Sequence, residues 1–334
     1  MKVLDLHCDT LNELRYGMLR GETIDMLHNN LHLDLSRMQK GDYLLQCFAL
    51  FTHIDRAPED PLVSALEETD LFRQMLCQYP QYISQVRTMK DIEENRKAGK
   101  ISALLTIEEG GCCKGNLSVL RQMYENGVRI MTLTWNFENE LGFPNTPPGD
   151  GKNAFPAGAD IVHGLKDRGF EFIHEMERLG IIIDVSHLSD AGFWDVANNT
   201  SRPFIASHSN ARALAGHVRN LTDAMIRTIA DRGGVTGINY CANFLDPDYQ
   251  NPEAQSRVSY MADHIEYIRR LGGIDMIALG SDFDGIEKNL EMYDCSCLPM
   301  LERELRRRSF TESEIEKIYH GNALRVLSEF LPAE

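Results

Sequence analysis

The chain has 334 residues and a mass of 37.9 kDa, and its 34 Lys and Arg residues against 50 Asp and Glu residues give a formal net charge of −16. With 43% hydrophobic and 25% charged residues, its composition is that of an ordinary globular protein and excludes wholesale disorder. A sequence pI near 5.1 argues against a nucleic-acid binder and against attachment to anionic lipid, because both need a basic face.

The expected environment is the cytoplasm. No apolar stretch approaches the roughly 18 residues of a membrane helix, and the N-terminus has no signal-peptide pattern. The eight cysteines include no C-x-x-C pair and are expected to be unpaired thiols. We therefore expect no membrane and no nucleic-acid partner, and a homodimer is the base-rate expectation for assembly.

Short runs rich in Val, Ile and Leu recur along the chain. Several are apolar at successive positions, which is typical of strands buried on both faces. They predict eight strands, at residues 3–7, 43–51, 101–109, 128–134, 181–187, 203–208, 234–239 and 276–282.

Amphipathic segments separate these strands. Helical spacing of apolar residues predicts helices at 61–79, 117–126, 161–179, 258–271 and 315–327. Gly127 is a predicted C-cap, and Thr311 with Glu314 forms a predicted capping box. Eight strand–helix units predict a (β/α)8 TIM barrel that takes up residues 1–334 as one domain, with an open doubly wound sheet as the alternative. Residues 142–158, with four prolines and four glycines, are predicted to form a loop over the site.

Polar residues gather at the predicted strand ends. His7 and Asp9 follow the first strand as H-x-D, and period-two alternation turns both to one face while Cys8 points to the other. The other strand ends carry Glu108 and Glu109, His187, His208 and Asp282. In barrel enzymes this face holds the active site.

These residue types favour a metal site. Imidazole nitrogen and carboxylate oxygen suit Zn²⁺, and they are borderline ligands for Mn²⁺, Co²⁺ or Fe²⁺. Three histidines with two or three carboxylates exceed the needs of one tetrahedral ion and match two ions that share a carboxylate. A water between two such ions is hydroxide near neutral pH and hence a nucleophile.

Three further residues are candidates for substrate binding. Arg219 follows His208 by eleven residues, and its forked guanidinium suits a substrate carboxylate, although a surface salt bridge explains it as well. Trp135 and Asn136 close the fourth strand and offer an aromatic wall and an amide donor. A tryptophan packed in the core is the structural alternative for Trp135.

Taken together, these motifs resemble the membrane (renal) dipeptidase family, the zinc peptidases of the M19 class, whose fold is related to the amidohydrolase barrels. The resemblance covers the chain from about residue 7 to 327. It rests on His7-Cys8-Asp9, Glu109-Gly110-Gly111, Thr132-Leu133-Thr134, Ile183-Asp184-Val185-Ser186-His187, Ser207-His208-Ser209, Arg219-Asn220 and Gly280-Ser281-Asp282-Phe283-Asp284-Gly285.

The resemblance implies a role for each of these residues. Two Zn²⁺ ions would be held by His7, Asp9 and Glu109 on one side and by Glu109, His187 and His208 on the other. Glu109 would then be the bridge and Glu108 a neighbour that is not a ligand. The catalytic acid/base would be Asp282, and Arg219 would bind the terminal carboxylate of a dipeptide.

One position departs from the family pattern. Well-known animal members carry a histidine directly after Thr-Leu-Thr, where this chain has Trp135. We expect Asn136 to supply the oxyanion donor in its place. Two other functions remain open. One is another amidohydrolase-type activity, such as an N-acyl amino acid deacylase or lactonase, and the other is a non-catalytic binding barrel.

Overall fold

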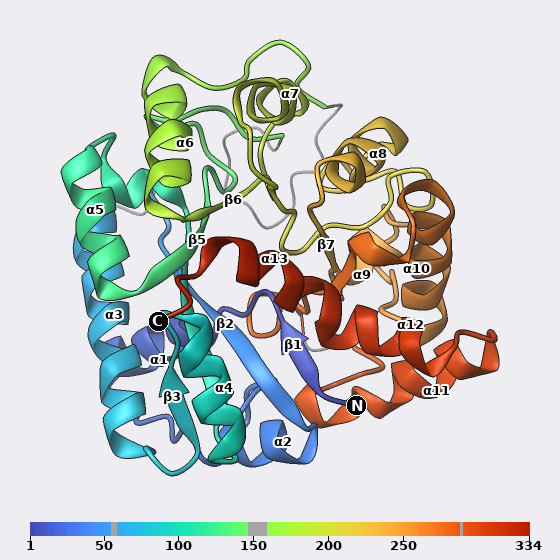
Figure 1. Ribbon diagram of the computed structural model, residues 1–334, viewed down its shortest axis with the longest axis horizontal. Coiled ribbons are helices and arrows are strands. Elements are labelled where there is room, and N and C mark those ends of the chain that lie inside the picture. Colours follow the sequence, from blue (N-terminus) through green and yellow to red (C-terminus); the bar gives the residue numbers. More distant parts are fainter. Residues whose placement is uncertain (55–58, 146–158, 288–289) are drawn as a thin grey trace.

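The computed structural model describes residues 1–54, 59–145, 159–287 and 290–334. Its centre is a parallel β-sheet in which β1 lies beside β2 and β8, and the order is β6-β5-β4-β2-β1-β8-β7, with β3 paired to the start of β4 (Figure 1). The strands are β1 (Val3–Asp5), β2 (Tyr43–Phe51), β3 (Ile83–Gln85), β4 (Ile101–Glu108), β5 (Val128–Thr132), β6 (Ile182–Asp184), β7 (Thr236–Ile238) and β8 (Ile277–Leu279).

The segment at residues 204–207 closes the sheet into a barrel. Ile205 bridges to Asp184 of β6, and the next residue, Ala206, bridges to Thr236 of β7, both in parallel orientation. The predicted barrel is thereby confirmed, although residues 203–208 form isolated bridges in place of the predicted full strand. β3 was not predicted from the sequence.

Helices surround this sheet (Figure 1). The predicted capping box of Thr311 and Glu314 is present, and Gly127 ends α5 with φ of 108°. The helices are α1 (Thr10–Leu19), α2 (Leu35–Lys40), α3 (Pro61–Gln78), α4 (Met89–Lys97), α5 (Leu117–Asn126), α6 (Asp167–Leu179), α7 (Asp190–Asn199), α8 (Asp223–Asp231), α9 (Ala242–Leu245), α10 (Val258–Gly272), α11 (Pro299–Arg307), α12 (Glu312–Glu316) and α13 (Asn322–Phe330).

Two apolar clusters fill the molecule. The larger, called the outer core below, lies between strands and helices. The smaller, the interior cluster, lies inside the barrel and includes Leu4, Leu104 and Ile182. Val326 and Phe330 of α13 belong to the interior cluster, so the C-terminal helix covers the barrel near the strand starts and crosses the strands in Figure 1. The carboxyl ends of the strands are left for polar residues. In the part of the chain that the structure describes, no helix has the length and apolar character needed to cross a membrane.

Candidate active site

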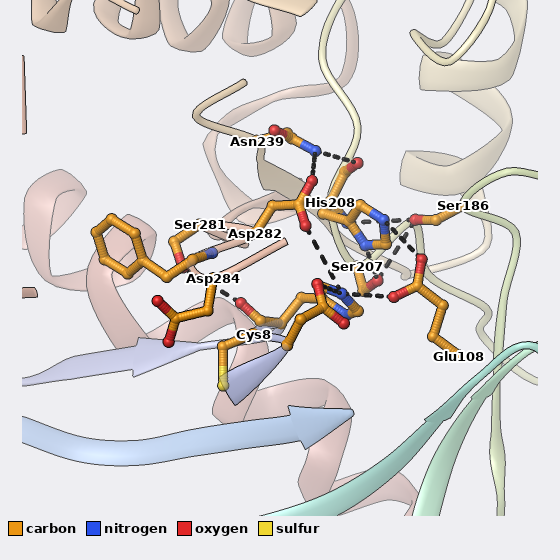
Figure 2. Close-up of polar contacts among 12 residues, drawn as sticks. Cys8, Glu108, Ser186, Ser207, His208, Asn239, Ser281, Asp282 and Asp284 are labelled. Atoms are coloured by element: carbon orange, nitrogen blue, oxygen red, sulfur yellow. Dashed lines mark hydrogen bonds and ion pairs between the residues drawn. The ribbon is translucent and has the colours of Figure 1, made fainter. Parts of the chain in front are cut away.

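The polar residues at the strand ends converge on the side chain of Glu108. Its Oε2 lies 2.8 Å from Nε2 of His7, and its Oε1 lies 2.9 Å from Nε2 of His187 and 3.6 Å from Nε2 of His208. The rings of His7 and His208 stack with their centroids 4.0 Å apart. All four side chains are buried, and Figure 2 shows Glu108 directed toward the His208 ring. The alternation argument for His7 agrees with this geometry, because Cys8 points away and is buried in the outer core.

Two further carboxylates complete the cluster on the side of His7. Asp9 Oδ2 lies 3.4 Å from His7 Nε2, and Asp282 Oδ1 lies 3.9 Å from the same atom. Asp282 is held by Asn239, whose Nδ2 donates to its Oδ2 at 2.9 Å (Figure 2). The backbone of Gly285 comes so close that a Cβ there would lie 2.0 Å from Asp9 Oδ2, so only glycine leaves room for this carboxylate.

The two adjacent glutamates lie on different sides of the strand end. Glu109, predicted to be the bridging carboxylate, turns away from the histidines, and Glu108 takes the central position. Glu109 accepts hydrogen bonds from the backbone N–H groups of Gly111 and Trp135, both at 2.7 Å, and from Nδ2 of Asn139. It has φ of 154°, so the chain leaves the strand at this residue. Burial raises the pKa of Glu109 to about 7.

The signal for this difference was present in the sequence. Side chains of a strand alternate between two faces, and along β4 the side chain of Leu104 lies in the barrel interior while Leu105 and Ile107 pack in the outer core. The same period places Glu108 inside. Alternation therefore distinguishes the two glutamates once the register of β4 is known.

The backbone is strained where the strands meet the site. His187 has φ of 68° and Asp282 has φ of 63°, values that residues with a side chain adopt only at a cost. Both residues are buried and held by contacts of their side chains. This strain is typical of functional positions and aims both side chains into the cluster.

Burial and neighbouring charges shift the pKa values of the cluster residues in different directions. The pKa of Glu108 is held well below its ordinary value, because the attraction of His7 outweighs the cost of burial. Burial lowers the pKa of His187 to about 4 and that of His208 well below its usual range. These two histidines are therefore neutral near pH 7, as metal ligands must be. His7 differs, because Glu108 and Asp9 overcome the effect of burial and raise its pKa well above the ordinary value.

The cluster fits a metal ion. Among the described residues, the buried atom Asp9 Oδ1 has no hydrogen-bond partner, and His7 Nε2 and Glu108 Oε2, although 2.8 Å apart as an ion pair, make no hydrogen bond of good geometry. Ligand atoms of His7, Glu108 and His208 lie within 4.8 Å of one another, and so do those of His7, Asp9 and Asp282. The two groups share only His7, so together they offer ligand atoms for more than one ion position. Buried polar atoms without partners are costly, and a cation among them would supply what they lack.

Asn136 lies beside the cluster in a role that the sequence did not suggest. It was expected to be an oxyanion donor. Its Oδ1 lies 3.0 Å from Nδ1 of His187, and an amide oxygen accepts only, so this nitrogen of the ring carries the proton. The contact that the structure shows therefore orients a histidine, whose Nε2 is left to face Glu108.

Trp135 is half-buried at the edge of the cluster. Its ring centroid lies 6.2 Å from that of His187, and the rings of Phe51, His53 and Phe137 surround it at 4.9–5.6 Å. The tryptophan thus belongs to an aromatic wall that begins next to the histidines.

Arg219 lies next to the strand end that bears His208. It donates hydrogen bonds at 3.3 Å to the backbone oxygen of His208 and to Oγ of Ser209. The residue is only 5% exposed, and among the described residues it has no carboxylate within ion-pair distance and its Nε has no hydrogen-bond partner. A surface salt bridge is therefore not its role.

Comparison with known proteins identifies the family. The family model described as membrane dipeptidase (peptidase family M19) matches residues 1–332. The chain belongs to the membrane dipeptidase family. The resemblance found in the sequence is confirmed, and the chain is a metallo-dipeptidase by class.

Individual relatives agree with this assignment. Dipeptidase aclJ of Aspergillus oryzae is 33% identical over 319 residues, which cover 90% of this chain and 71% of the relative. A metallo peptidase of Rhodobacter sphaeroides, solved with a phosphinate mimic of the dipeptide L-Ala-D-Ala, is 26% identical with a TM-score of 0.88 over 99% of both chains. A further solved M19 dipeptidase is 26% identical with a TM-score of 0.89 and covers 100% of this chain and 99% of its own.

Proposed function

We propose that this metallo-dipeptidase hydrolyses the peptide bond of dipeptides at a site for two Zn²⁺ ions that share Glu108. His7 and Asp9 would hold one ion, and His187 and His208 would hold the other. Nitrogen and oxygen ligands of this kind suit zinc. When bound, the metal pair supplies Lewis-acid polarisation of the scissile carbonyl and lowers the pKa of the attacking water.

The observation that carries this proposal is the orientation of Glu108. One of its oxygens faces His7 at 2.8 Å and the other faces His187 at 2.9 Å, so a single carboxylate serves both sides of the cluster. A structural salt bridge needs only one such contact. This arrangement is what two ions with a common carboxylate require.

Asp282 is the proposed acid/base. Its Oδ2 is occupied by Asn239, which leaves Oδ1 directed toward His7 and the cluster. Burial raises the pKa of Asp282 well above its ordinary value, which suits a carboxyl that must hold a proton during the reaction. In the proposed reaction Oδ1 accepts a proton from the attacking water and then donates it to the leaving amine nitrogen.

Arg219 is the proposed recognition site for the free carboxylate of the substrate. Its guanidinium is buried, fixed by His208 and Ser209, and not neutralised by a carboxylate among the described residues. Because it lies next to the strand end that bears His208, a carboxylate bound here is close to the scissile bond. This distance favours dipeptides over longer peptides.

The proposal is tested by metal analysis and a substrate panel. The purified protein is expected to contain close to two equivalents of zinc, to lose dipeptide hydrolysis after chelation and to regain it when zinc is added. The panel contains dipeptides, the same dipeptides with an amidated C-terminus, N-acyl amino acids and lactones. Free dipeptides are expected to be cleaved and their amides to be poor substrates.

Other results would replace the proposal. Hydrolysis of N-acyl amino acids or lactones in preference to dipeptides would make the chain an amidohydrolase of another specificity. Full activity in the metal-free protein would refute the metal site. Equal cleavage of free and amidated dipeptides would remove Arg219 from its proposed role.

A further inference from the structure

A buried carboxylate lies beneath the histidine cluster and is fully engaged. Asp184, the last residue of β6, is 1% exposed. Its Oδ1 accepts from the backbone N–H groups of Ser186 at 3.0 Å and Ser207 at 2.9 Å. Its Oδ2 accepts from the hydroxyls of Thr132 at 2.7 Å and Ser207 at 2.5 Å. A carboxylate has about four acceptor positions, so all of them are used.

The hydroxyl of Ser207 connects this carboxylate to His208. Its Oγ lies 2.7 Å from Nδ1 of the His208 ring, and Figure 2 shows Ser186 and Ser207 beside that ring. A serine hydroxyl has one proton, and a carboxylate can only accept. The proton of Ser207 therefore points to Asp184, and the serine oxygen must accept a proton from Nδ1 of His208.

This direction of donation determines the tautomer of His208. With the proton on Nδ1, the other ring nitrogen, Nε2, carries a lone pair and faces Glu108. It lies 3.0 Å from Nε2 of His187, whose proton is also on Nδ1, so two lone pairs face each other where a cation between them would stabilise both. We propose that Asp184 and Ser207 are positioning residues that hold His208 in the tautomer and ring orientation needed to bind a metal. The metal-binding part of this inference rests on the proposed function, whereas the tautomer does not.

A second aspartate–serine pair links neighbouring strand ends in the same way. It shows that such a link does not by itself require a contact with a histidine ring. Asp5 of β1 accepts from the backbone N–H of Ser281 at 2.8 Å and from its hydroxyl at 2.6 Å, as Asp184 does from Ser207. The Oγ of Ser281, however, accepts from the backbone N–H of Phe283 at 3.1 Å. Both pairs join neighbouring strand ends, but only Ser207 continues to the ring of a site histidine.

The decisive variant is Ser207→Ala, with Thr132→Val as its matched control. Each substitution removes one hydroxyl that donates to Oδ2 of Asp184, and only the first removes the acceptor of His208 Nδ1. Loss of such an outer partner of a metal-binding histidine typically weakens metal affinity by about 10–100-fold. We expect that loss in Ser207→Ala, and an affinity within about threefold of the wild type in Thr132→Val.

Two measurements test the proposal on the 334-residue chain. The first is zinc affinity of the chelator-treated protein, measured by competition with a chromophoric chelator. The second is the ¹⁵N NMR spectrum of its histidines in the metal-free state, where each tautomer has a distinct pair of nitrogen shifts. In the wild type we expect His208 protonated at Nδ1, and in Ser207→Ala we expect a mixture of tautomers.

The outcomes separate this proposal from the proposed function. A proton on Nε2 of His208 in the wild type would overturn the inference, and this measurement requires no variant to fold. Equal losses of zinc affinity in Ser207→Ala and Thr132→Val would overturn it too. They would show that Asp184 and its partners only connect the strands and do not position His208. If the wild type binds no zinc but His208 is protonated at Nδ1, the metal site fails and the tautomer assignment stands.

Discussion

Exchanging the two adjacent glutamates for glutamine, one at a time, tests the central geometry of the site. In Glu108→Gln, the amide retains an oxygen for only one of the two histidines that the carboxylate faces. Changing an outer partner of a ligand costs about 10–100-fold in metal affinity, so removing a shared ligand is expected to cost more than about 100-fold, or about 2.8 kcal/mol. Dipeptide hydrolysis is expected to fall together with the metal content.

Glu109→Gln is the matched control, with a different expected cost. Its carboxylate accepts from Gly111 and Asn139 on one oxygen and from the backbone N–H of Trp135 on the other. If the oxygen of the glutamine amide still accepts from Gly111 and Asn139, its NH2 group faces the backbone N–H of Trp135. These two donors cannot hydrogen-bond to each other. Leaving buried donors unsatisfied costs about 1–3 kcal/mol, so the free energy of unfolding is expected to fall by that amount while the metal content remains.

The assay pairs elemental analysis of the purified variants with urea unfolding. Glu108→Gln is expected to lose zinc, and Glu109→Gln is expected to keep it while unfolding at a lower urea concentration. The reasoning is refuted if Glu109→Gln loses the metal and Glu108→Gln retains it. That result would restore the assignment suggested by the Glu-Gly-Gly motif.

Three further predictions concern single residues. Asp282→Asn is expected to lower kcat by at least about 100-fold with the metal content unchanged, and near-normal turnover would exclude the acid/base role. Arg219→Lys is expected to raise KM for free dipeptides much more than for their C-terminal amides, since a lysine lacks the forked donor geometry; equal effects on both would contradict it. His264 is buried with Nδ1 accepting from the backbone N–H of Ala211, and burial lowers its pKa to about 4. The unfolded chain therefore takes up the proton first as the pH falls below about 6.5, and wild-type stability is expected to drop by about 2 kcal/mol more than that of His264→Gln between pH 7 and pH 5, measured by urea unfolding; parallel pH curves would contradict it.

The barrel was predictable because its signal is repeated. Each strand is a short apolar run, and eight such runs separated by helical patterns leave few architectures. The ends of the strands were less predictable. The sequence predicted strands to residues 7, 187 and 282, whereas β1, β6 and β8 end at Asp5, Asp184 and Leu279.

The strand-end aspartates explain this difference. Asp184 accepts the backbone N–H of Ser207, and Asp5 accepts those of His7 and Ser281, so a side chain takes the place of a carbonyl in the neighbouring strand. The regular ladder stops at these points although the chain continues in the same direction. A pattern of apolar residues does not reveal where a side chain replaces a backbone carbonyl as hydrogen-bond acceptor. For the same reason it did not reveal that residues 203–208 close the barrel through isolated bridges.

The same limit explains the exchange of the two glutamates. Alternation correctly predicted that His7 and Asp9 share a face, because both lie within three residues of one strand end and need no outside reference. For Glu108 and Glu109 alternation requires an anchor, namely that Leu104 lies inside the barrel, and this is a property of the closed sheet. The Glu-Gly-Gly motif favoured Glu109, but those glycines serve the turn, in which the N–H of Gly111 donates to Glu109 itself. A motif therefore located the strand end that bears the proposed ligand, and only the register of the strand could identify which of its two carboxylates faces the histidines.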